Sequence, residues 1–415
     1  MPFGVVAPNL LVAQVNHWAK WPSTQDIDHL RADGWQPAPF REFILKVHSR
    51  CNLSCRYCYM YEMADQSWRS QPKRMSRETI TLACERIAEH AQTHRLDSIK
   101  LILHGGEPLL AGPENLAFTV TSLRSRLGPA TKAEVAIQTN GVLLDATYLK
   151  LFDELDIKVG VSLDGDADGH DRHRRRANGQ GSYAAVVTGL EYLTSPTFRH
   201  LFSGLLCTID PRNAPVGTYE SLLRFDPPAV DFLLPHGNWA TSPPGRLADT
   251  RQTPYGDWLV KVFDRWYHSG RHETDVRLFS EVIRLLIGLP SRVETIGLSP
   301  VSIVVIETDG SIEQADSLKS AYEGATATGL HLREDSLDRA LLLPATVARQ
   351  IGERALCETC RSCRIHNVCG GGLYAHRYSD ENGFANPSVY CEDLKRLIYH
   401  IRRTMQKRVD DLRQR

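Results

Sequence analysis

The sequence predicts an α/β protein built on a partial (β/α)6 barrel, followed by a helical bridging region and a smaller C-terminal module. Three observations predict this fold. β-rich runs alternate with helical stretches from about residue 42 to residue 236, the composition changes near residue 240, and a dense group of cysteines begins near residue 357. A chain of 415 residues also exceeds the usual size of one domain, so a large core with an added module is expected.

Six β-rich runs supply the expected barrel strands. Their sequences are EFILKVHS, IKLILHGG, EVAIQTNG, KVGVSLDG, FSGLLCTID and AVDFLLPHG. Between them, Ile80, Ala83 and Ile87 recur near the helical period, and Asp145 is the expected N-cap of DATYLKLFDELD. Strands that alternate with helices predict a parallel sheet, and such sheets bind ligands at the carboxyl ends of their strands.

The pattern is less regular after residue 236. YGDWLVKVFDRWYHSG and DVRLFSEVIRLLIGL are expected helices, and VSIVVIETDGSIEQADSL predicts a hairpin that turns at Asp309-Gly310. The expected segments are an N-terminal extension (1–40), the barrel (41–236), a helical bridging region (237–300), a cysteine-rich domain (301–395) and a C-terminal helix (396–415).

Charge and hydropathy exclude several classes of partner. Lys+Arg and Asp+Glu both count 49, and this balance argues against a nucleic-acid partner. No apolar run approaches the roughly 18 residues of a spanning helix, and the start of the sequence lacks the pattern of a signal peptide. We therefore expect a cytoplasmic protein with no membrane partner. Thiols stay reduced there, so clustered cysteines indicate metal binding or chemistry.

Cys51, Cys55 and Cys58 lie in one short segment, CNLSCRYCY, directly after the first expected strand. Three thiolates on such a loop suit a [4Fe–4S] cluster in which one iron lacks a protein ligand. A small molecule with an amine and a carboxylate would chelate that iron. A zinc site would favour paired cysteines with a nearby histidine, and His48 lies on the strand instead. Buried structural thiols are the third interpretation.

CNLSCRYCY resembles the CxxxCxΦC signature of radical S-adenosylmethionine (SAM) enzymes, with Tyr57 at the aromatic position. The resemblance implies a [4Fe–4S] cluster on Cys51, Cys55 and Cys58 that binds SAM through its unique iron. It also implies that an electron from the reduced cluster cleaves SAM, and that the resulting 5′-deoxyadenosyl radical abstracts hydrogen from the substrate.

The segment HGGEP resembles the GGEP element of the same family. This resemblance implies that Gly105 and Gly106 let the backbone approach SAM closely. It also implies that Glu107 accepts hydrogen bonds from the SAM amino group. An ordinary Gly-Pro turn is the alternative.

Two further segments fit the resemblance. In SLDG, Ser162 and Asp164 are expected near the ribose or methionyl part of SAM, although Asp-Gly turns are common on their own. In HDRHRRR, Arg174 is the candidate partner of the SAM carboxylate, because a guanidinium fork suits planar oxyanions. The remaining arginines of this run are expected on a solvated surface or as a site that attracts an acidic peptide.

A second group has the spacing C-x2-C-x5-C at Cys360, Cys363 and Cys369, followed by Cys391. Four thiolates can bind every iron of a [4Fe–4S] cluster and leave no position for SAM. The spacing resembles the SPASM domain of radical SAM enzymes that act on peptides, which implies an auxiliary [4Fe–4S] cluster here. A zinc ribbon is the alternative. Cys357 is a spare thiol or an alternative ligand.

The chain departs from a complete SPASM domain, which carries seven cysteines for two auxiliary clusters. Residues 314–316 on the expected hairpin and Leu373 stand where further cysteines would be. One auxiliary cluster is therefore predicted. Cys84 and Cys207 are expected to be small core residues.

Longer stretches, such as FREFILKVHSRCNLSCRYCYMYEMADQSWR and CGGGLYAHRY, resemble the FxsB-type peptide maturases. This resemblance implies a ribosomally made precursor peptide as substrate and an electron donor such as flavodoxin or ferredoxin. The implied product is a three-residue cyclophane, formed when a Cβ radical attacks the ring of a nearby aromatic residue. The substrate must then lose a proton and an electron, for which Asp316 and His376 are candidate bases. Polar surface roles are the simpler expectation for both.

Other functions stay open at this point. A sulfatase-maturating enzyme, which makes formylglycine, shares the barrel motifs but carries both auxiliary clusters. Epimerisation and thioether formation belong to the same superfamily. A non-catalytic zinc-binding interaction module is the rival from another class, although it does not explain HGGEP or the βα pattern.

Overall fold

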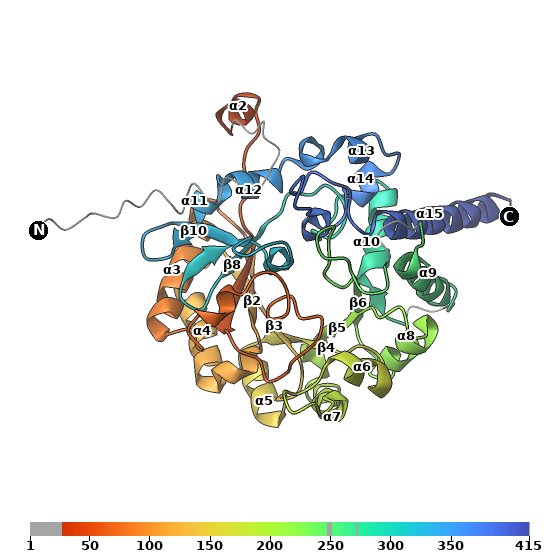
Figure 1. The fold of residues 1–415 in the computed structure, drawn as a ribbon. Coiled ribbons are helices and arrows are strands. Elements are labelled where there is room, and N and C mark those ends of the chain that lie inside the picture. The colour runs from red at the N-terminus through yellow and green to blue at the C-terminus, as the bar shows by residue number, and fades with distance from the viewer. Residues whose placement is uncertain (1–26, 247–250, 271–272, 415) are drawn as a thin grey trace, which may run out of the picture.

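The computed structural model describes residues 27–246, 251–270 and 273–414, and its strands form one curved sheet with helices on the outside (Figure 1). The strands are β1 (Glu42–His48), β2 (Ser98–Gly105), β3 (Lys132–Thr139), β4 (Ile157–Ser162), β5 (Phe202–Thr208), β6 (Ala229–Leu233), β7 (Asp275–Val276), β8 (Ile303–Ile306), β9 (Ser311–Glu313) and β10 (Ala327–His331). Their order is β10-β9-β8-β1-β2-β3-β4-β5-β6-β7. Neighbours from β8 to β7 are parallel, which confirms the predicted βα array.

Helices connect the barrel strands as the sequence predicts. They are α3 (Arg77–Thr93), α4 (Pro113–Arg126), α5 (Ala146–Glu154), α6 (Ala167–His173), α7 (Tyr183–Leu193) and α8 (Pro215–Leu223). The expected N-cap is confirmed, since the Asp145 carboxylate accepts hydrogen bonds from the backbone of Thr147 and Tyr148. Ile80, Ala83 and Cys84 on α3 are buried against the sheet, and Cys207 on β5 is also buried. Both cysteines are core residues.

The hairpin of β8 and β9 is confirmed, and it belongs to the barrel sheet. Val305 pairs with Glu313, and Gly310 in the turn has φ +102°, which favours glycine. β8 also lies parallel to β1, with Phe43 opposite Val304. The chain after the bridging region therefore continues the sheet of the barrel. The predicted segment boundaries stay predictions.

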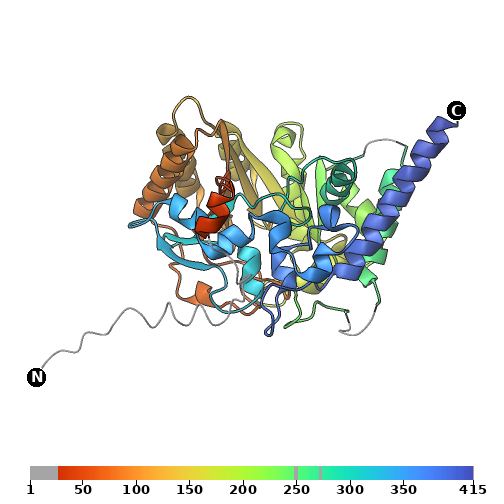
Figure 2. The same cartoon turned by 90° about the horizontal axis from the view of Figure 1, so that it is seen from above.

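The remaining helices cover one side of the barrel. They are α2 (Ile27–Ala32), α9 (Pro254–Tyr267), α10 (Arg277–Leu286), α11 (Leu337–Leu341), α12 (Pro344–Ala348), α13 (Glu358–Arg361), α14 (His366–Cys369) and α15 (Cys391–Arg413). The second expected helix of the bridging region begins at Arg277, because Asp275 and Val276 pair with β6. α15 begins at Cys391, before the expected C-terminal helix of residues 396–415, and projects from the body at its C-terminal end (Figure 2).

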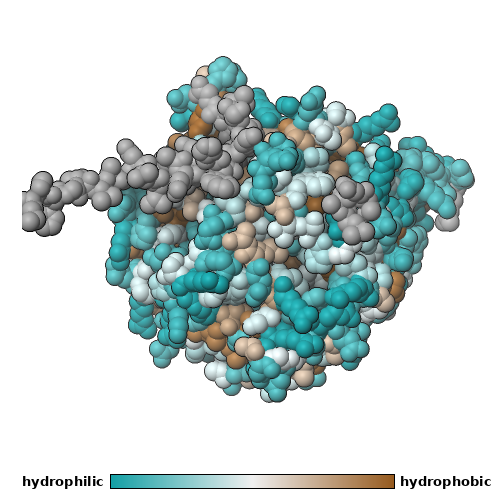
Figure 3. All heavy atoms as spheres, in the orientation of Figure 1, coloured by the Kyte–Doolittle hydropathy of each residue, from teal (hydrophilic) through white to brown (hydrophobic). Residues whose placement is uncertain are grey.

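Polar side chains cover most of the face shown in Figure 3, with apolar residues in small groups between them. Among the described helices, none has the length and apolar character needed to cross a membrane. Most of the expected N-terminal extension lies outside the described residues, which begin at residue 27.

Candidate active site and auxiliary cysteine site

A cavity of about 200 Å³ lies at the carboxyl ends of the six barrel strands. Each strand contributes lining residues from its last position or from the segment that follows it. Examples in strand order are Cys51, Gly106, Asn140, Ser162, Thr208 and His236. The expectation that the motifs meet at this edge of the sheet is confirmed.

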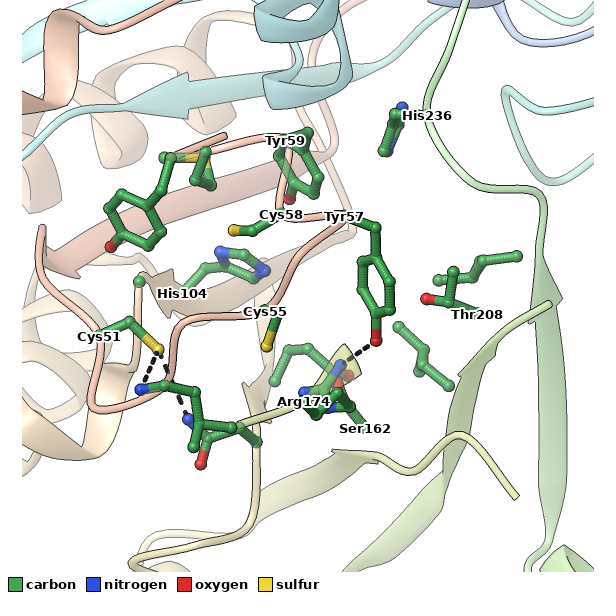
Figure 4. A pocket seen from close by; sticks show the side chains of 18 of the residues that line it. Cys51, Cys55, Tyr57, Cys58, Tyr59, His104, Ser162, Arg174, Thr208 and His236 are labelled. Carbon is green, nitrogen blue, oxygen red and sulfur yellow. Dashed lines mark hydrogen bonds between the residues drawn. The ribbon is translucent and has the colours of Figure 1, made fainter. Parts of the chain in front are cut away.

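The three cysteines of the first group all line this cavity, and Figure 4 shows their sulfur atoms directed into the same space as His104. The loop that carries them is tied to the segment around α6. The amide of Ser54 donates to the carbonyl of Arg175 at 2.7 Å, and that of Arg56 to His173 at 3.2 Å. His48 does not line the cavity, since its ring bonds the backbone of Arg50. A zinc site completed by His48 is therefore not formed.

The sulfur atoms of this loop lie in an environment that suits bound metal. Burial raises the pKa of Cys51 to about 12 and that of Cys58 to about 11. Buried thiolates need nearby positive charge, which iron ions supply. The same cavity holds buried nitrogens without a hydrogen-bond partner, on Arg174 (Nε), His104 (Nδ1) and His236 (Nδ1). The donor set and the space beside it fit a three-cysteine cluster with a further polar ligand.

HGGEP forms part of the cavity wall, but its glutamate does not. A Cβ on Gly106 would lie 2.6 Å from the backbone carbonyl of Arg50, so glycine is required for packing against the segment that leads into the cysteine loop. Glu107 is buried behind the wall, where it accepts hydrogen bonds from Thr139 Oγ1 at 2.7 Å and from the Asn140 amide at 2.8 Å. Glu107 thus positions Thr139 and Asn140, which line the cavity, and its contact with the ligand amine stays a prediction.

Tyr57 connects the SLDG segment with Arg174 of the HDRHRRR segment. Its hydroxyl donates to Asp164 Oδ2. It also accepts a hydrogen bond from Arg174 Nη1 at 2.9 Å (Figure 4). Arg174, Tyr57 and Ser162 line the cavity, whereas Asp164 lies behind Tyr57 and also accepts from the Thr208 amide. Asp164 therefore supports Tyr57, and its expected contact with the ligand stays a prediction. Of the basic run after α6, only Arg174 lines the cavity.

Comparison with known proteins agrees with this geometry. Residues 45–209 match the radical SAM superfamily. They form a radical SAM domain. That span contains the cysteine loop, HGGEP, SLDG and Arg174. The chain is thus a radical SAM enzyme, and the superfamily's cofactors are SAM and a [4Fe–4S] cluster.

Several relatives of this radical SAM enzyme extend beyond the domain. It is 24% identical over 364 residues to the cysteine-type anaerobic sulfatase-maturating enzyme of Clostridium novyi, covering 85% of this chain and 92% of the relative. It is 26% identical over 362 residues to the serine-type enzyme of Klebsiella aerogenes, covering 84% and 82%.

Two solved structures share its fold. The structure of anSMEcpe with bound AdoMet and the Cp18Cys peptide has a TM-score of 0.75 at 20% identity, covering 89% of this chain and 99% of that one. Streptococcus suis SuiB bound to precursor peptide SuiA has a TM-score of 0.58 at 13% identity, covering 88% and 78%.

His236 is a cavity residue of the radical SAM enzyme that the sequence analysis did not single out. It follows β6, is partly buried, and has an unpartnered Nδ1. Its ring centroid lies 4.6 Å from that of Tyr59 and 5.7 Å from that of His376. Burial lowers the pKa of His236 to about 4, although Asp316 opposes the shift. Its place after a predicted strand was the signal that could have identified it.

The two candidate bases are buried, so the expectation of surface roles is wrong. Asp316 Oδ2 accepts from Lys46 Nζ at 2.8 Å, and its Oδ1 has no partner. Beside this pair, Lys319 Nζ donates to Glu313 at 3.0 Å. Ion pairs therefore occupy the hairpin where the SPASM pattern has a cysteine. His376 Nε2 is also unpartnered, and neither candidate lines the cavity.

The four cysteines of the second group line one smaller cavity of about 30 Å³, and Cys357 does not line it. Cys357 bonds the thiol of Cys360, which lowers the pKa of Cys357 to about 6. A Cβ on Gly370 would lie 1.7 Å from the Gly297 carbonyl oxygen, so this glycine is required by packing. Arg377 donates to the carbonyls of residues 370–372. The enclosed four-thiol set is consistent with an auxiliary cluster.

Proposed function

We propose that this radical SAM enzyme modifies a ribosomally synthesised precursor peptide by joining the Cβ of one residue to a nearby aromatic ring, forming a cyclophane. Two observations support the proposal. The sequence resembles FxsB-type maturases over most of its length, and the structure has one four-cysteine cavity together with a hairpin filled by ion pairs. The second observation carries the proposal, because it separates this chain from enzymes with two auxiliary clusters.

Cys51, Cys55 and Cys58 would hold the [4Fe–4S] cluster, and the adjoining cavity would hold SAM. Bound together, these groups supply a 5′-deoxyadenosyl radical that abstracts hydrogen from the substrate. Arg174 is directed into the cavity with a free Nε and suits the SAM carboxylate. Four further lining residues would contact SAM, namely Gly105, Gly106, Thr139 and Asn140. Glu107 holds the last two in place.

Crosslinking removes two hydrogens from the peptide. One leaves as a hydrogen atom, and the other leaves as a proton and an electron after the new C–C bond forms. The proton needs an acceptor near the cavity. His236 is best placed because it lines the cavity, its Nδ1 has no hydrogen-bond partner, and its ring is neutral at neutral pH since burial lowers its pKa to about 4.

Asp316 and His376 are the other candidates for this proton, and both lie behind the cavity wall. Burial raises the pKa of Asp316, but Lys46, Lys319 and His104 outweigh it, so the group stays a carboxylate. His376 packs against His236 and is kept neutral by burial. In this proposal both residues support His236. The negative charge of Asp316 favours the protonated form of His236, and His376 is a second neutral ring packed against it.

The electron also needs an acceptor, and this is the chemistry that a cluster on Cys360, Cys363, Cys369 and Cys391 would supply. The chain's own contribution is to enclose that site between α13, α14 and the start of α15. An external donor such as flavodoxin or ferredoxin, in the cytoplasm, would reduce the first cluster.

Formylglycine formation is the second candidate, and the relatives at 24–26% identity favour it. It also removes two hydrogens when the substrate residue is serine. The two reactions differ in what they leave behind, because formylglycine carries an aldehyde and a cyclophane does not.

The deciding experiment is anaerobic incubation of the enzyme with SAM, dithionite and the precursor peptide encoded beside its gene. We expect the peptide to lose two hydrogens, to be inert toward a hydrazide, and to resist fragmentation between the linked residues in tandem mass spectrometry. A hydrazide-reactive product would replace the proposal with formylglycine formation. Unchanged mass with deuterium at one Cα would indicate epimerisation, and loss of a cysteine thiol to a cross-bridge would indicate a thioether.

Metal analysis separates all of these from a non-catalytic zinc module. About eight irons per chain in a brown protein is the expected result for two [4Fe–4S] clusters. Zinc at the cysteines of a colourless protein would support the module instead.

A further inference from the structure

A cluster of metal-type ligands lies on the outer side of the barrel and contributes to neither cysteine cavity. His90 lies in the last turn of α3 and His94 is the C-cap residue of this helix, four positions later, while Asp338 lies on α11. Asp338 Oδ1 is 2.5 Å from His90 Nδ1 and 2.9 Å from His94 Nε2. All three ligand atoms lie within 4.8 Å of one another, so one ion could contact them together.

Both ring nitrogens of His90 lie beside oxygen atoms that accept hydrogen bonds. Its Nε2 lies 3.2 Å from the carbonyl oxygen of Phe40, which can only accept. When Nε2 carries the ring proton, Nδ1 directs a lone pair at the Asp338 carboxylate, which is also an acceptor. At 2.5 Å a second ring proton satisfies both atoms, and a metal ion would satisfy them after the two side chains move apart to its own bond lengths. His90 is 1% exposed and packs against Phe40 and Phe43, so the position of its ring is fixed by the core.

We propose that His90 Nδ1, His94 Nε2 and Asp338 bind one divalent transition-metal ion of the zinc type. Two imidazoles and a carboxylate are a zinc ligand set, and histidines at i and i+4 on a helix present their rings to one ion. The bond from His90 Nε2 to Phe40 is the kind of supporting hydrogen bond that metal-ligating histidines make.

The surroundings of Asp338 agree with this assignment. Among the described residues, its only ionic partners are the two histidines, so neither lysine nor arginine neutralises it. The side chains of His94 and Asp338 are 25% and 36% exposed, which leaves a water molecule access to the fourth position. The ion would fasten α11, in the C-terminal part of the chain, to α3 of the barrel and to the segment before β1.

Zinc binding to the intact enzyme tests this site. The holoenzyme, with its clusters in place, is incubated anaerobically with Zn²⁺, desalted, and analysed for zinc and iron. We expect the wild-type protein to retain about one more zinc per chain than His94→Ala or Asp338→Asn, with equal iron in all three. His200→Ala is the matched control, because its exposed pair with Asp153 belongs to no three-ligand group, and it should retain wild-type zinc.

Diffraction from zinc-soaked crystals, measured on both sides of the zinc edge, gives an independent readout that iron does not mimic. A peak between His90, His94 and Asp338 is expected. Equal zinc in wild type and both variants, or a zinc signal at the cysteines alone, would overturn the proposal and leave a hydrogen-bonded His-Asp-His tie. If His94→Ala also loses iron, the zinc content of Asp338→Asn relative to wild type decides whether the site binds zinc.

Discussion

The two cysteine cavities differ in the way that their functions require. The cavity at the strand ends has three cysteines and about 200 Å³ of space, whereas the cavity beside α14 has four cysteines and about 30 Å³. The first combines sulfur with Arg174 and two histidines, and the second adds Ile365, His366, Lys395 and small residues to its cysteines. A missing ligand and free space belong to a site that receives a substrate-like molecule, and a complete ligand set with little free space belongs to a site that transfers electrons.

Removing one cysteine from each site should have the largest effect on iron content and activity, and should show the different roles of the two sites. Cys55→Ala should abolish release of 5′-deoxyadenosine and remove about four irons per chain. The loop offers only three cysteine ligands, and two cannot hold the cluster. Cys363→Ala should remove the other irons and abolish peptide product, while SAM is still cleaved. Iron analysis and chromatography of the nucleoside give both readouts.

Cys84→Ala is the matched control for these variants, since this thiol is buried in the core away from both cavities. It should keep all its iron and lose about 1 kcal/mol of stability. Wild-type nucleoside release by Cys55→Ala would contradict the assignment of the first site.

His236→Gln should separate SAM cleavage from product formation. We expect peptide product to fall by about 100-fold, the usual contribution of a proton acceptor, while nucleoside release changes by less than about threefold. Because burial lowers the pKa of His236 to about 4, the wild-type enzyme should show no loss of product on this account between about pH 6 and 8. Equal loss of both products would instead indicate a role in holding SAM.

Arg174→Lys should weaken SAM binding with no loss of iron. Lysine keeps the charge but loses the planar fork, so the KM for SAM should rise by about tenfold. Arg172→Lys is the control, because Arg172 pairs with Asp210 and does not line the cavity. The KM is measured from the rate of nucleoside release, and an unchanged value for Arg174→Lys would remove Arg174 from the SAM site.

The smallest effect on chemistry is expected at the buried pair of Lys46 and Asp316. Lys46→Met leaves a buried carboxylate without its partner and should lower the free energy of unfolding by about 3 kcal/mol. Lys46→Met with Asp316→Leu should recover most of this loss. The folded pKa of Asp316 is lowered, so its contribution is present above its unfolded pKa of about 4 and is lost as the pH falls below that value. Thermal unfolding of the single and double variants at two pH values checks both statements.

Local sequence was sufficient for the features that depend on spacing along the chain. The six strands, the cap at Asp145 and the two cysteine groups follow from periodicity and short motifs. Features that depend on distant segments were not accessible. Lys46 and Asp316 are 270 residues apart, and they meet because the hairpin of β8 and β9 lies beside β1.

The orientation of single side chains was also beyond the sequence. HGGEP indicated a ligand site, but the direction of the Glu107 carboxylate depends on the amide of Asn140, which comes from another strand end. His236 carried no motif, and its importance arises from a free ring nitrogen inside a cavity. Such residues are identified by what surrounds them.

The parallel pairing of β8 with β1 limits how this enzyme can be taken apart. A fragment that stopped before residue 303 would leave one edge of β1 with unsatisfied amides and carbonyls, open to strands from other molecules. Barrel-only fragments should therefore self-associate. Exchanging the C-terminal part between homologues would require keeping β8 to β10 with the barrel, with the junction placed after His331.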